Sequence, residues 1–217
     1  MRYYIADCHF FHSGINERMD KRGFKNVTEM NEHMISQWNS RVRRNDEVVI
    51  LGDLSTGSVE ETNEIVKRLN GRLYWILGNH DSKLAGNSKL DKSRFRWIKD
   101  YAEMNDNGRK VVLSHYPILF YSGQFRRDEN GNAKVWMLHG HTHITEDQTQ
   151  LERFKDEVRK YPRRTRQSDT PIPAPVQIIN CFCMFSDYVP LTLDEWIELE
   201  NTGKTREMLT GDWFYDK

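Results

Sequence analysis

The chain has 217 residues, of which 37% are hydrophobic and 29% charged, a composition typical of one soluble globular domain that spans residues 1–217. Lysine plus arginine and aspartate plus glutamate each number 32, so the net charge of zero excludes a general attraction to nucleic acid or to an anionic membrane. A membrane helix is also excluded, because no stretch approaches the roughly 20 consecutive apolar residues that such a helix needs.

The first part of the chain alternates between short apolar runs and segments with helical periodicity. Met30, Met34 and Trp38 recur at the spacing of one helix face. Ser58 and Glu61 have the spacing of a capping box, which opens a helix. The predicted elements are, in chain order, a strand over 2–6, a helix over 29–42, a strand over 47–51, a helix over 58–69 and a strand over 72–77.

The second part of the chain continues this alternation and adds a segment rich in charge and proline. Pro171, Pro173 and Pro175 indicate a surface loop. The predicted elements are strands over 110–113 and 135–138, a charged helix over 146–160, a surface loop over 163–175, a strand over 176–179 and a helix over 193–200. We expect the charged helix and loop, about 146–175, to be an insertion in the domain, and about 203–217 to be a C-terminal tail.

Five of the predicted strands run directly into polar residues of types that bind metals. These strand-end residues are Asp7 and His9, Asp53, Asn79 and His80, His115, and His141 and His143. Strands buried on both faces read as continuous apolar runs, as these do, and layered α/β folds build their sites at the carboxyl ends of such strands. We therefore expect these residues to converge on one edge of a sheet, although they are far apart in the sequence.

The strand-end residues combine imidazole, carboxylate and amide groups, a ligand set for borderline divalent metals such as Zn, Mn, Fe, Co or Ni. Two acidic residues suffice for two dications if one carboxylate bridges them. His141 and His143, on an extended loop, can reach two neighbouring points. A lone histidine at a strand end is more often a hydrogen-bonded structural residue. The ordered repetition after five strands nevertheless favours a metal site over packing.

These motifs resemble those of the calcineurin-like metallophosphoesterases. They are Asp7-x-His9, Gly52-Asp53, Gly78-Asn79-His80-Asp81, Ser114-His115 and Gly140-His141-x-His143. The resemblance covers roughly residues 2–143 and implies an α/β fold, a four-layer α/β/β/α sandwich. It also implies two divalent metal ions. The first would be held by Asp7, His9, Asp53 and His143, and the second by Asp53, Asn79, His115 and His141, with Asp53 bridging them.

The resemblance further implies that a metal-activated hydroxide hydrolyses a phosphodiester or phosphomonoester. His80 would bind no metal; together with Asn79 it would contact the substrate phosphate, and it would assist the leaving group. Asp81 is expected to orient His80 or its loop, with a plain turn residue as the alternative. His12, on the same loop as His9, is expected either to contact substrate or to be an ordinary loop histidine.

Differences between these motifs and those of other branches of the superfamily narrow the subgroup that the chain resembles. The Gly52-Asp53 motif lacks the second aspartate and the arginine of the Ser/Thr protein phosphatases, whereas the opening Asp7-Cys8-His9 resembles the small prokaryotic phosphoesterases. The expected partner is a small phosphate ester or a nucleotide, with diesters favoured over monoesters and nucleic acid as an alternative. The rival functions are a metal-dependent nuclease of the same fold and a metal-binding scaffold that has lost catalysis.

The cysteines and the first residues bear on the cellular compartment. There are three cysteines, Cys8, Cys181 and Cys183, and the last two lie too close for an ordinary structural disulfide. An odd number without a disulfide framework indicates buried, reduced thiols and a cytoplasmic protein. The first residues also lack the charged and apolar regions of a signal peptide.

Two further features concern partners and the site. A basic cluster either recruits an anionic substrate, such as a nucleotide or a nucleic-acid end, or forms a solvated helix face paired with the acids between its members. Its residues are Arg153, Lys155, Arg159, Lys160, Arg163, Arg164 and Arg166. The interleaved acids favour the solvated face. Asn180, at the end of the last predicted strand, is expected to lie near the metals.

Overall fold

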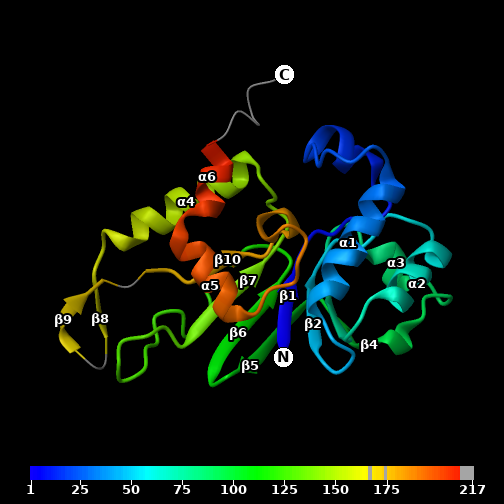
Figure 1. Ribbon diagram of the computed structural model, residues 1–217. Helices are drawn as coiled ribbons and strands as arrows, with labels where there is room; N and C mark the ends of the chain where they lie inside the picture. The colour runs from blue at the N-terminus through cyan, green and yellow to red at the C-terminus, as the bar shows by residue number, and fades with distance from the viewer. Residues whose placement is uncertain (166–167, 174, 211–217) are drawn as a thin grey trace.

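Two β-sheets pack face to face in the protein, which we describe from a computed structural model (Figure 1). The structure describes residues 1–165, 168–173 and 175–210. The first sheet is parallel throughout, with the order β1 (Arg2–Ile5), β2 (Glu47–Leu51), β3 (Arg72–Ile76) and β4 (Phe95–Lys99). The second has the order β10 (Ile178–Asn180), β7 (Val135–His139), β6 (Arg109–Ser114) and β5 (Tyr101–Asp106), and β5 runs antiparallel to β6.

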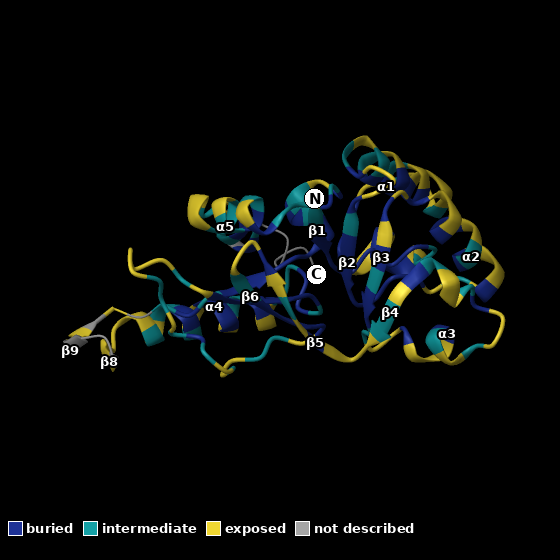
Figure 2. Cartoon of the chain, turned by 90° about the horizontal axis from the view of Figure 1, so that it is seen from below, coloured by how far each residue is buried: buried dark blue, intermediate teal, exposed yellow. Residues whose placement is uncertain are grey.

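Helices flank both sheets (Figures 1 and 2). Beside the first sheet lie α1 (Val27–Arg41), α2 (Val59–Arg68) and α3 (Ser82–Gly86), and beside the second lie α4 (Glu146–Arg159), α5 (Leu193–Thr202) and α6 (Lys204–Thr210). Short helical turns occur at Ile15–Met19, Lys92–Arg94 and Cys183–Ser186, and β8 (Arg163–Thr165) pairs with β9 (Ser168–Ile172) in a hairpin that extends from the body. Among the described residues, every helix is too short or too polar to cross a membrane.

The alternation of buried side chains along the second sheet defines the order of the layers. Val112 and Met137 point to one face, where they pack with Leu151 of α4. Val111 and Leu138 point to the other face and join the large core, which also contains residues of the first sheet, α1 and α2. Helices, sheet, sheet and helix therefore follow one another, which confirms the predicted four-layer α/β/β/α sandwich (Figure 2).

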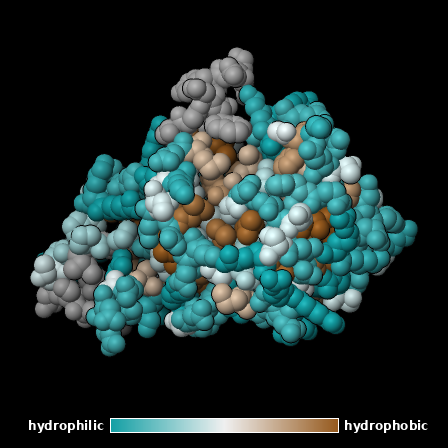
Figure 3. All heavy atoms as spheres, in the orientation of Figure 1, coloured by the Kyte–Doolittle hydropathy of each residue, from teal (hydrophilic) through white to brown (hydrophobic). Residues whose placement is uncertain are grey.

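The helices of the first sheet begin with side-chain caps and bury one face. The side chain of Ser58 accepts the backbone N–H of Glu61 while the carboxylate of Glu61 accepts the backbone N–H of Ser58, so the predicted capping box of α2 is confirmed. In α1 the predicted apolar stripe, including Met30 and Trp38, is buried. Hydrophilic residues dominate the margins of the face in Figure 3, and hydrophobic ones gather near its middle.

The segment 181–183 joins the two sheets at the carboxyl ends of their strands. The N–H of Ala6 donates to the carbonyl of Cys181 at 2.8 Å, and the N–H of Cys181 donates to the carbonyl of His139 at 2.8 Å. The N–H of Cys183 returns to the carbonyl of Ala6 at 3.0 Å. These bonds place the end of β1 beside the end of β7, so residues that follow the two strands are brought to one place.

The predicted strands and helices are present, with boundaries within two residues of those expected. The predicted surface loop over 163–175 is wrong, because β8 and β9 form a hairpin there. A strand of two arginines and a threonine and a strand containing Pro171 have no apolar alternation to reveal it. The 146–175 segment, expected as an insertion, contributes Leu151 of α4 to the core. The expected tail from about 203 begins with α6, and 211–217 lie outside the described residues.

Replacing Trp196 by Ala is expected to lower the free energy of unfolding by about 3–5 kcal/mol. The side chain of Trp196 is fully buried in the large core, and its indole N–H donates to the carbonyl of Tyr4 at 3.0 Å. Urea denaturation measures the loss, and Glu198→Ala, on the exposed face of α5, is the control, with a change within about 0.5 kcal/mol. A Trp196→Ala protein as stable as the control would mean that α5 is not part of the domain core.

Candidate metal centre

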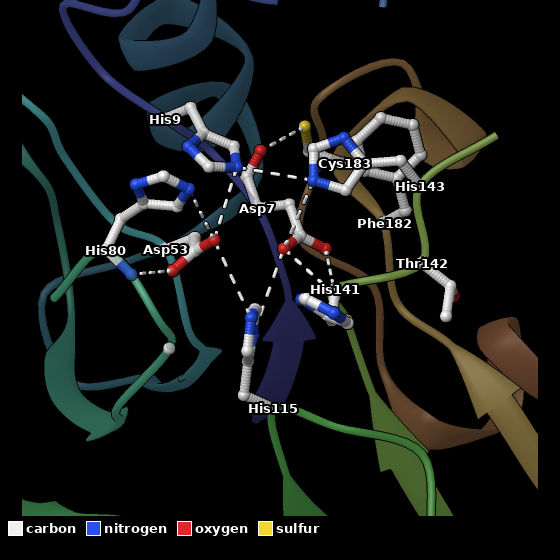
Figure 4. Close-up of polar contacts among 12 residues, drawn as sticks. Asp7, His9, Asp53, His80, His115, His141, Thr142, His143, Phe182 and Cys183 are labelled. Carbon is white, nitrogen blue, oxygen red and sulfur yellow. Dashed lines mark hydrogen bonds and ion pairs between the residues drawn. The ribbon is translucent and has the colours of Figure 1, made fainter. Parts of the chain in front are cut away.

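The candidate ligands follow the strands on backbone of unusual conformation. Five of them have positive φ angles: Asp7 (56°), His9 (49°), Asp53 (51°), His141 (70°) and His143 (44°). Positive φ is uncommon for residues other than glycine and is held only where the surroundings enforce it. Here the left-handed conformation after β1, β2 and β7 helps to direct the side chains of these residues toward one another (Figure 4).

Asp7, His9 and His143 form the first group of convergent donor atoms, and all three are buried. The Nε2 atoms of His9 and His143 are 3.3 Å apart. His143 Nε2 lies 3.6 Å from Oδ1 of Asp7. These three donor atoms lie within 4.8 Å of one another, which is the arrangement that one dication requires.

His115, Asn79 and His141 form a neighbouring group on the other side. Asn79 Oδ1 lies 3.0 Å from Nε2 of His115 and 2.9 Å from Nδ1 of His141. The carbonyl of Leu51 can only accept, so its 2.9 Å contact with His115 Nδ1 places the proton on Nδ1. The lone pair of His115 Nε2 is therefore free to face the site.

The carboxylate of Asp53 lies between the two groups. Its Oδ2 atom is 3.5 Å from His9 Nε2 and 3.6 Å from His115 Nε2, and its Oδ1 accepts the backbone N–H of His80 at 2.9 Å. Asp7 also approaches His115, at 3.9 Å from Nδ1, but that nitrogen is occupied by Leu51. Of the two carboxylates, Asp53 is thus the one whose oxygen faces free donor atoms of both groups.

The donor set fits divalent cations. Carboxylate oxygens, imidazole lone pairs and an amide oxygen converge, and they are acceptors that repel one another unless positive charge lies between them. His9 Nε2 and the carboxylates of Asp7 and Asp53 are buried, so water cannot easily supply that compensation. The chemistry of the cluster therefore matches borderline dications of the kind expected from the sequence.

The pKa shifts of Asp7, His9 and His143 also favour a positive charge among their donor atoms. Burial lowers the pKa of His9 well below its usual value and keeps this ring neutral, as a ligand must be. Burial would also lower the pKa of His143, but the carboxylates of Asp7 and Asp20 raise it to about 10. Burial of Asp7 is outweighed by the neighbouring histidines, His143 foremost, which hold its pKa well below the usual range. The carboxylates thus attract a cation, either a proton or a metal ion, to His143 Nε2.

Asp20 and Arg22 lie directly behind the first group, and the sequence did not reveal either of them. Asp20 Oδ1 accepts from Nδ1 of His143 at 2.8 Å, which leaves Nε2 free to face the site. Arg22 donates to Asp20 Oδ2 at 3.0 and 3.1 Å, and to the carbonyls of Asp7 at 2.9 Å and Cys8 at 2.8 Å. Both residues sit on an irregular loop without periodicity, and only their Asp-x-Arg spacing could have drawn attention.

Two glycines of the motifs provide the space that the carboxylates occupy. A Cβ at Gly140 would lie 2.5 Å from Oδ2 of Asp7, and a Cβ at Gly78 would lie 2.6 Å from the backbone nitrogen of Asp53 and overlap its side chain. Real Cβ atoms do not approach other atoms so closely. The sequence indicated these glycines by motif, and the structure gives their physical reason.

Asp81 binds the backbone of the neighbouring loops. The carboxylate is fully buried and accepts four N–H groups at 2.7–3.1 Å. The donors are the backbone nitrogens of Asp53, Leu54 and Gly78 and the indole nitrogen of Trp75. Burial raises the pKa of Asp81 to about 6, with the hydrogen bonds opposing it. Within the described residues its side chain bonds no atom of the His80 ring, so it acts on the loop that carries His80 and on the backbone of Asp53.

His80 and His12 border the group on its open side. The His80 side chain is 47% exposed, with its Nε2 4.0 Å from Oδ2 of Asp53. The centroid of its ring is 5.4 Å from that of His9 and 6.2 Å from that of His12. Nδ1 of His12 accepts the backbone N–H of Ile15 at 3.1 Å, which fixes the ring beside the site.

The remaining predicted residues take supporting positions. Asn180 Nδ2 donates to Thr142 Oγ1 at 3.0 Å and to the carbonyl of His143 at 3.4 Å, so its amide nitrogen holds the loop that carries His143. The cysteines are free and buried, as predicted. The thiol of Cys183 donates to the carbonyl of Asp7 at 3.2 Å, and burial raises its pKa to about 12.

Comparison with known proteins gave concordant matches. The model of a family described as calcineurin-like phosphoesterase matches residues 3–179. An uncharacterized protein of Methanocaldococcus jannaschii is 30% identical over 204 residues, 93% of this chain and 92% of that protein. The Gene 66 protein of Mycobacterium phage D29 is 30% identical over 164 residues, 65% of this chain and 77% of that protein. A solved structure of a protein of unknown function from Aquifex aeolicus shares the fold, with a TM-score of 0.59, 23% identity and coverage of 92% of this chain and 98% of that one.

Replacing Asp81 by Asn is expected to lower the free energy of unfolding by about 1–3 kcal/mol, because the amide NH₂ would face at least one N–H donor and leave it unpaired. Urea denaturation measures the loss. The control is Asp100→Asn, on the exposed turn between β4 and β5, which should change stability by less than about 0.5 kcal/mol. Equal stability of the two variants would mean that these hydrogen bonds do not hold the loops.

Proposed function

Because the chain belongs to the calcineurin-like phosphoesterase family, we propose that it is a two-metal phosphoesterase that hydrolyses diesters in preference to monoesters. The family makes it a hydrolase of phosphate esters. The observation that carries the two-metal proposal is the position of Asp53, whose Oδ2 lies 3.5 Å from His9 Nε2 and 3.6 Å from His115 Nε2. One carboxylate between two sets of donor atoms is what a bridged pair of dications requires.

Each ion would take ligands from both sheets. Asp7, His9, Asp53 and His143 would hold the first, and Asp53, Asn79, His115 and His141 the second. Asp20, by accepting the Nδ1 proton of His143, would keep that ring in the tautomer and orientation that ligation needs. Manganese, iron, zinc, cobalt and nickel all suit this mixture of nitrogen and oxygen donors.

The chain's own residues would orient the ester and manage its protons. Divalent ions at such a site polarise a phosphoryl oxygen and lower the pKa of a water molecule. His80, exposed at the open side, would donate a proton or a hydrogen bond to the leaving oxygen. With its Oδ1 directed to His115 and His141, Asn79 would offer its NH₂ group to a phosphate oxygen. His12, fixed beside His80, would contact the same phosphate.

An exposed aromatic side chain supports the preference for diesters. Tyr116 follows His115 directly, its side chain is 49% exposed, and its ring centroid lies 4.5 Å from that of His141. A diester carries a second substituent that could pack on this ring, whereas a monoester has none. The convergence of every predicted ligand, with His80 beside them, favours an enzyme over the scaffold alternative.

Replacing Asp53 by Asn is expected to reduce the metal content of the protein from two ions per chain to one or fewer, with turnover of a bis-nitrophenyl phosphate reduced accordingly. The amide removes the negative charge and one of the two carboxylate oxygens that the ions would share. Affinity for the metal ions should fall at least 100-fold, which is roughly the largest loss seen when a residue that only hydrogen-bonds to a metal ligand is removed. Metal content is measured by mass spectrometry after dialysis. Asp147→Asn, exposed on α4, should retain both ions; two ions and full turnover in Asp53→Asn would exclude the bridging role.

Replacing His80 by Ala is expected to leave both ions bound and to reduce kcat by roughly 10²–10⁴-fold. The loss should be larger for an ester with an alkyl leaving group than for a nitrophenyl ester, because nitrophenolate leaves without a proton. Steady-state kinetics on the two kinds of ester measure this difference, with His33→Ala on α1 as the control. An equal loss on both esters would argue against the acid role, and no loss on either would exclude it.

A further inference from the structure

A hollow of about 750 Å³ lies beside the segment 116–134, which connects the end of β6 to the start of β7. Its walls contain five cationic side chains: Arg126, Arg127, Lys134, Arg163 and Arg164. None of the described residues that line it is acidic. The chain as a whole has no net charge, so this concentration of positive charge is a local feature that favours anions at the hollow.

Unlike their neighbours in α4, these cations form no ion pair with the side chains that the structure describes, although the charge of Lys134 helps to lower the pKa of Asp128. Arg159 of α4 pairs with Asp156 at 3.3 Å, and Lys160, which follows the helix, pairs with Glu157 at 2.7 Å. Lys155 is buried against glutamates. The basic cluster noted in the sequence therefore divides: its α4 part pairs with acids, whereas Arg163 and Arg164 line the hollow; Arg166 lies outside the described residues. Among the residues whose side chains the structure describes, no carboxylate lies within 4.0 Å of the five cations of the hollow.

The hollow also contains aromatic rings that are held in place. Phe120 is 67% exposed, and its ring meets that of Phe154 edge-on at a centroid distance of 5.7 Å. The guanidinium of Arg163 lies 4.1 Å from the centre of the Phe125 ring. The hydroxyl of Tyr121 donates to the carbonyl of Gln177 at 2.6 Å. Fixed rings and a flat guanidinium offer stacking surfaces to bases, and the surrounding cations suit phosphates.

The same segment leads from the hollow to the candidate metal centre. It begins next to His115, with Tyr116 against the ring of His141, and continues through the exposed residues Leu119 and Phe120 to the hollow. A chain of phosphates and bases seated in the hollow can therefore follow exposed apolar side chains toward the ligands. A duplex keeps its bases stacked inside, so exposed rings favour a single strand.

We propose that this hollow binds single-stranded nucleic acid and that nucleic acid is the substrate class of the site. The second part rests on the proposed function, and the first does not. A second cationic hollow, of about 480 Å³ at Arg44, Arg72, Arg94 and Arg96, has no aromatic lining residue. In it Arg94 donates to the carbonyls of Val66 and Leu69. This second hollow provides a matched control, because the same number of charges can be removed from it.

The test measures binding of a fluorescent 12-nucleotide single strand to the full chain by anisotropy, in EDTA, over a range of salt concentrations. Arg126→Ala/Arg164→Ala is the test variant, because neither side chain makes a hydrogen bond, ion pair or ring contact with the described residues. Loss of two phosphate contacts should weaken binding roughly 25-fold at 0.1 M salt and reduce the slope of log K against log salt by about 1.4. Arg44→Ala/Arg96→Ala should bind like the unchanged protein. Phe120→Ala should bind at least about 5-fold more weakly with an unchanged slope.

Three results would overturn the binding proposal. They are absence of binding by the unchanged protein, an equal loss in both arginine pairs, and tight binding of heparin or duplex DNA with no effect of Phe120→Ala. Hydrolysis of bis-nitrophenyl phosphate with Mn(II), which does not need the hollow, separates this failure from failure of the proposed function. Turnover of that ester without cleavage of a bound strand would exclude nucleic acid as substrate, whereas strand binding without any turnover would exclude the phosphoesterase.

Discussion

The carboxylate of Asp53 is the group on which the rest of the site depends. Its Oδ2 atom faces imidazole nitrogens on two sides, and acceptors so close together repel one another unless a cation lies among them. The backbone must therefore hold them in place. The left-handed strand ends, each of which costs on the order of 1–3 kcal/mol, the space left by Gly78 and the four N–H groups bound by Asp81 all serve this end.

The sequence predicted the strands that end in candidate metal ligands, because this pattern repeats along the chain. Apolar runs that end in His, Asp or Asn marked β1, β2, β3, β6 and β7, and parallel strands necessarily present their carboxyl ends at one edge. The features that the sequence could not predict depend on contacts between distant segments. Asp20 and Arg22 lie on an irregular loop, and their role exists only because His143 arrives from the second sheet. Likewise β4 and β5 were not predicted, because their few apolar residues are interleaved with charged and polar ones, and the β8–β9 hairpin has no apolar alternation.

The distribution of charge over the surface likewise depends on the fold and cannot be predicted from composition alone. Equal numbers of acidic and basic residues exclude a general polyanion affinity, and most cations of α4 are paired with acids of their own helix. The fold nevertheless collects unpaired arginines from two separate segments, 126–127 and 163–164, around one hollow. A local sequence window contains only part of this group, so its identity as one surface depends on the packing of β8 beside the 116–134 segment.

The division of the candidate ligands between two sheets has a mechanical consequence. Asp7, His9, Asp53 and Asn79 follow strands of the first sheet, and His115, His141 and His143 follow strands of the second. Apart from core packing, the main backbone link between these edges is the short segment 181–183. An ion held by both sets of ligands would act as a cross-link, so that neither half of the sandwich could open without releasing it. Separation of the two sheets would then weaken binding of the ion. Binding of the ion would, in turn, stabilise the packed arrangement of the sheets by the same free energy.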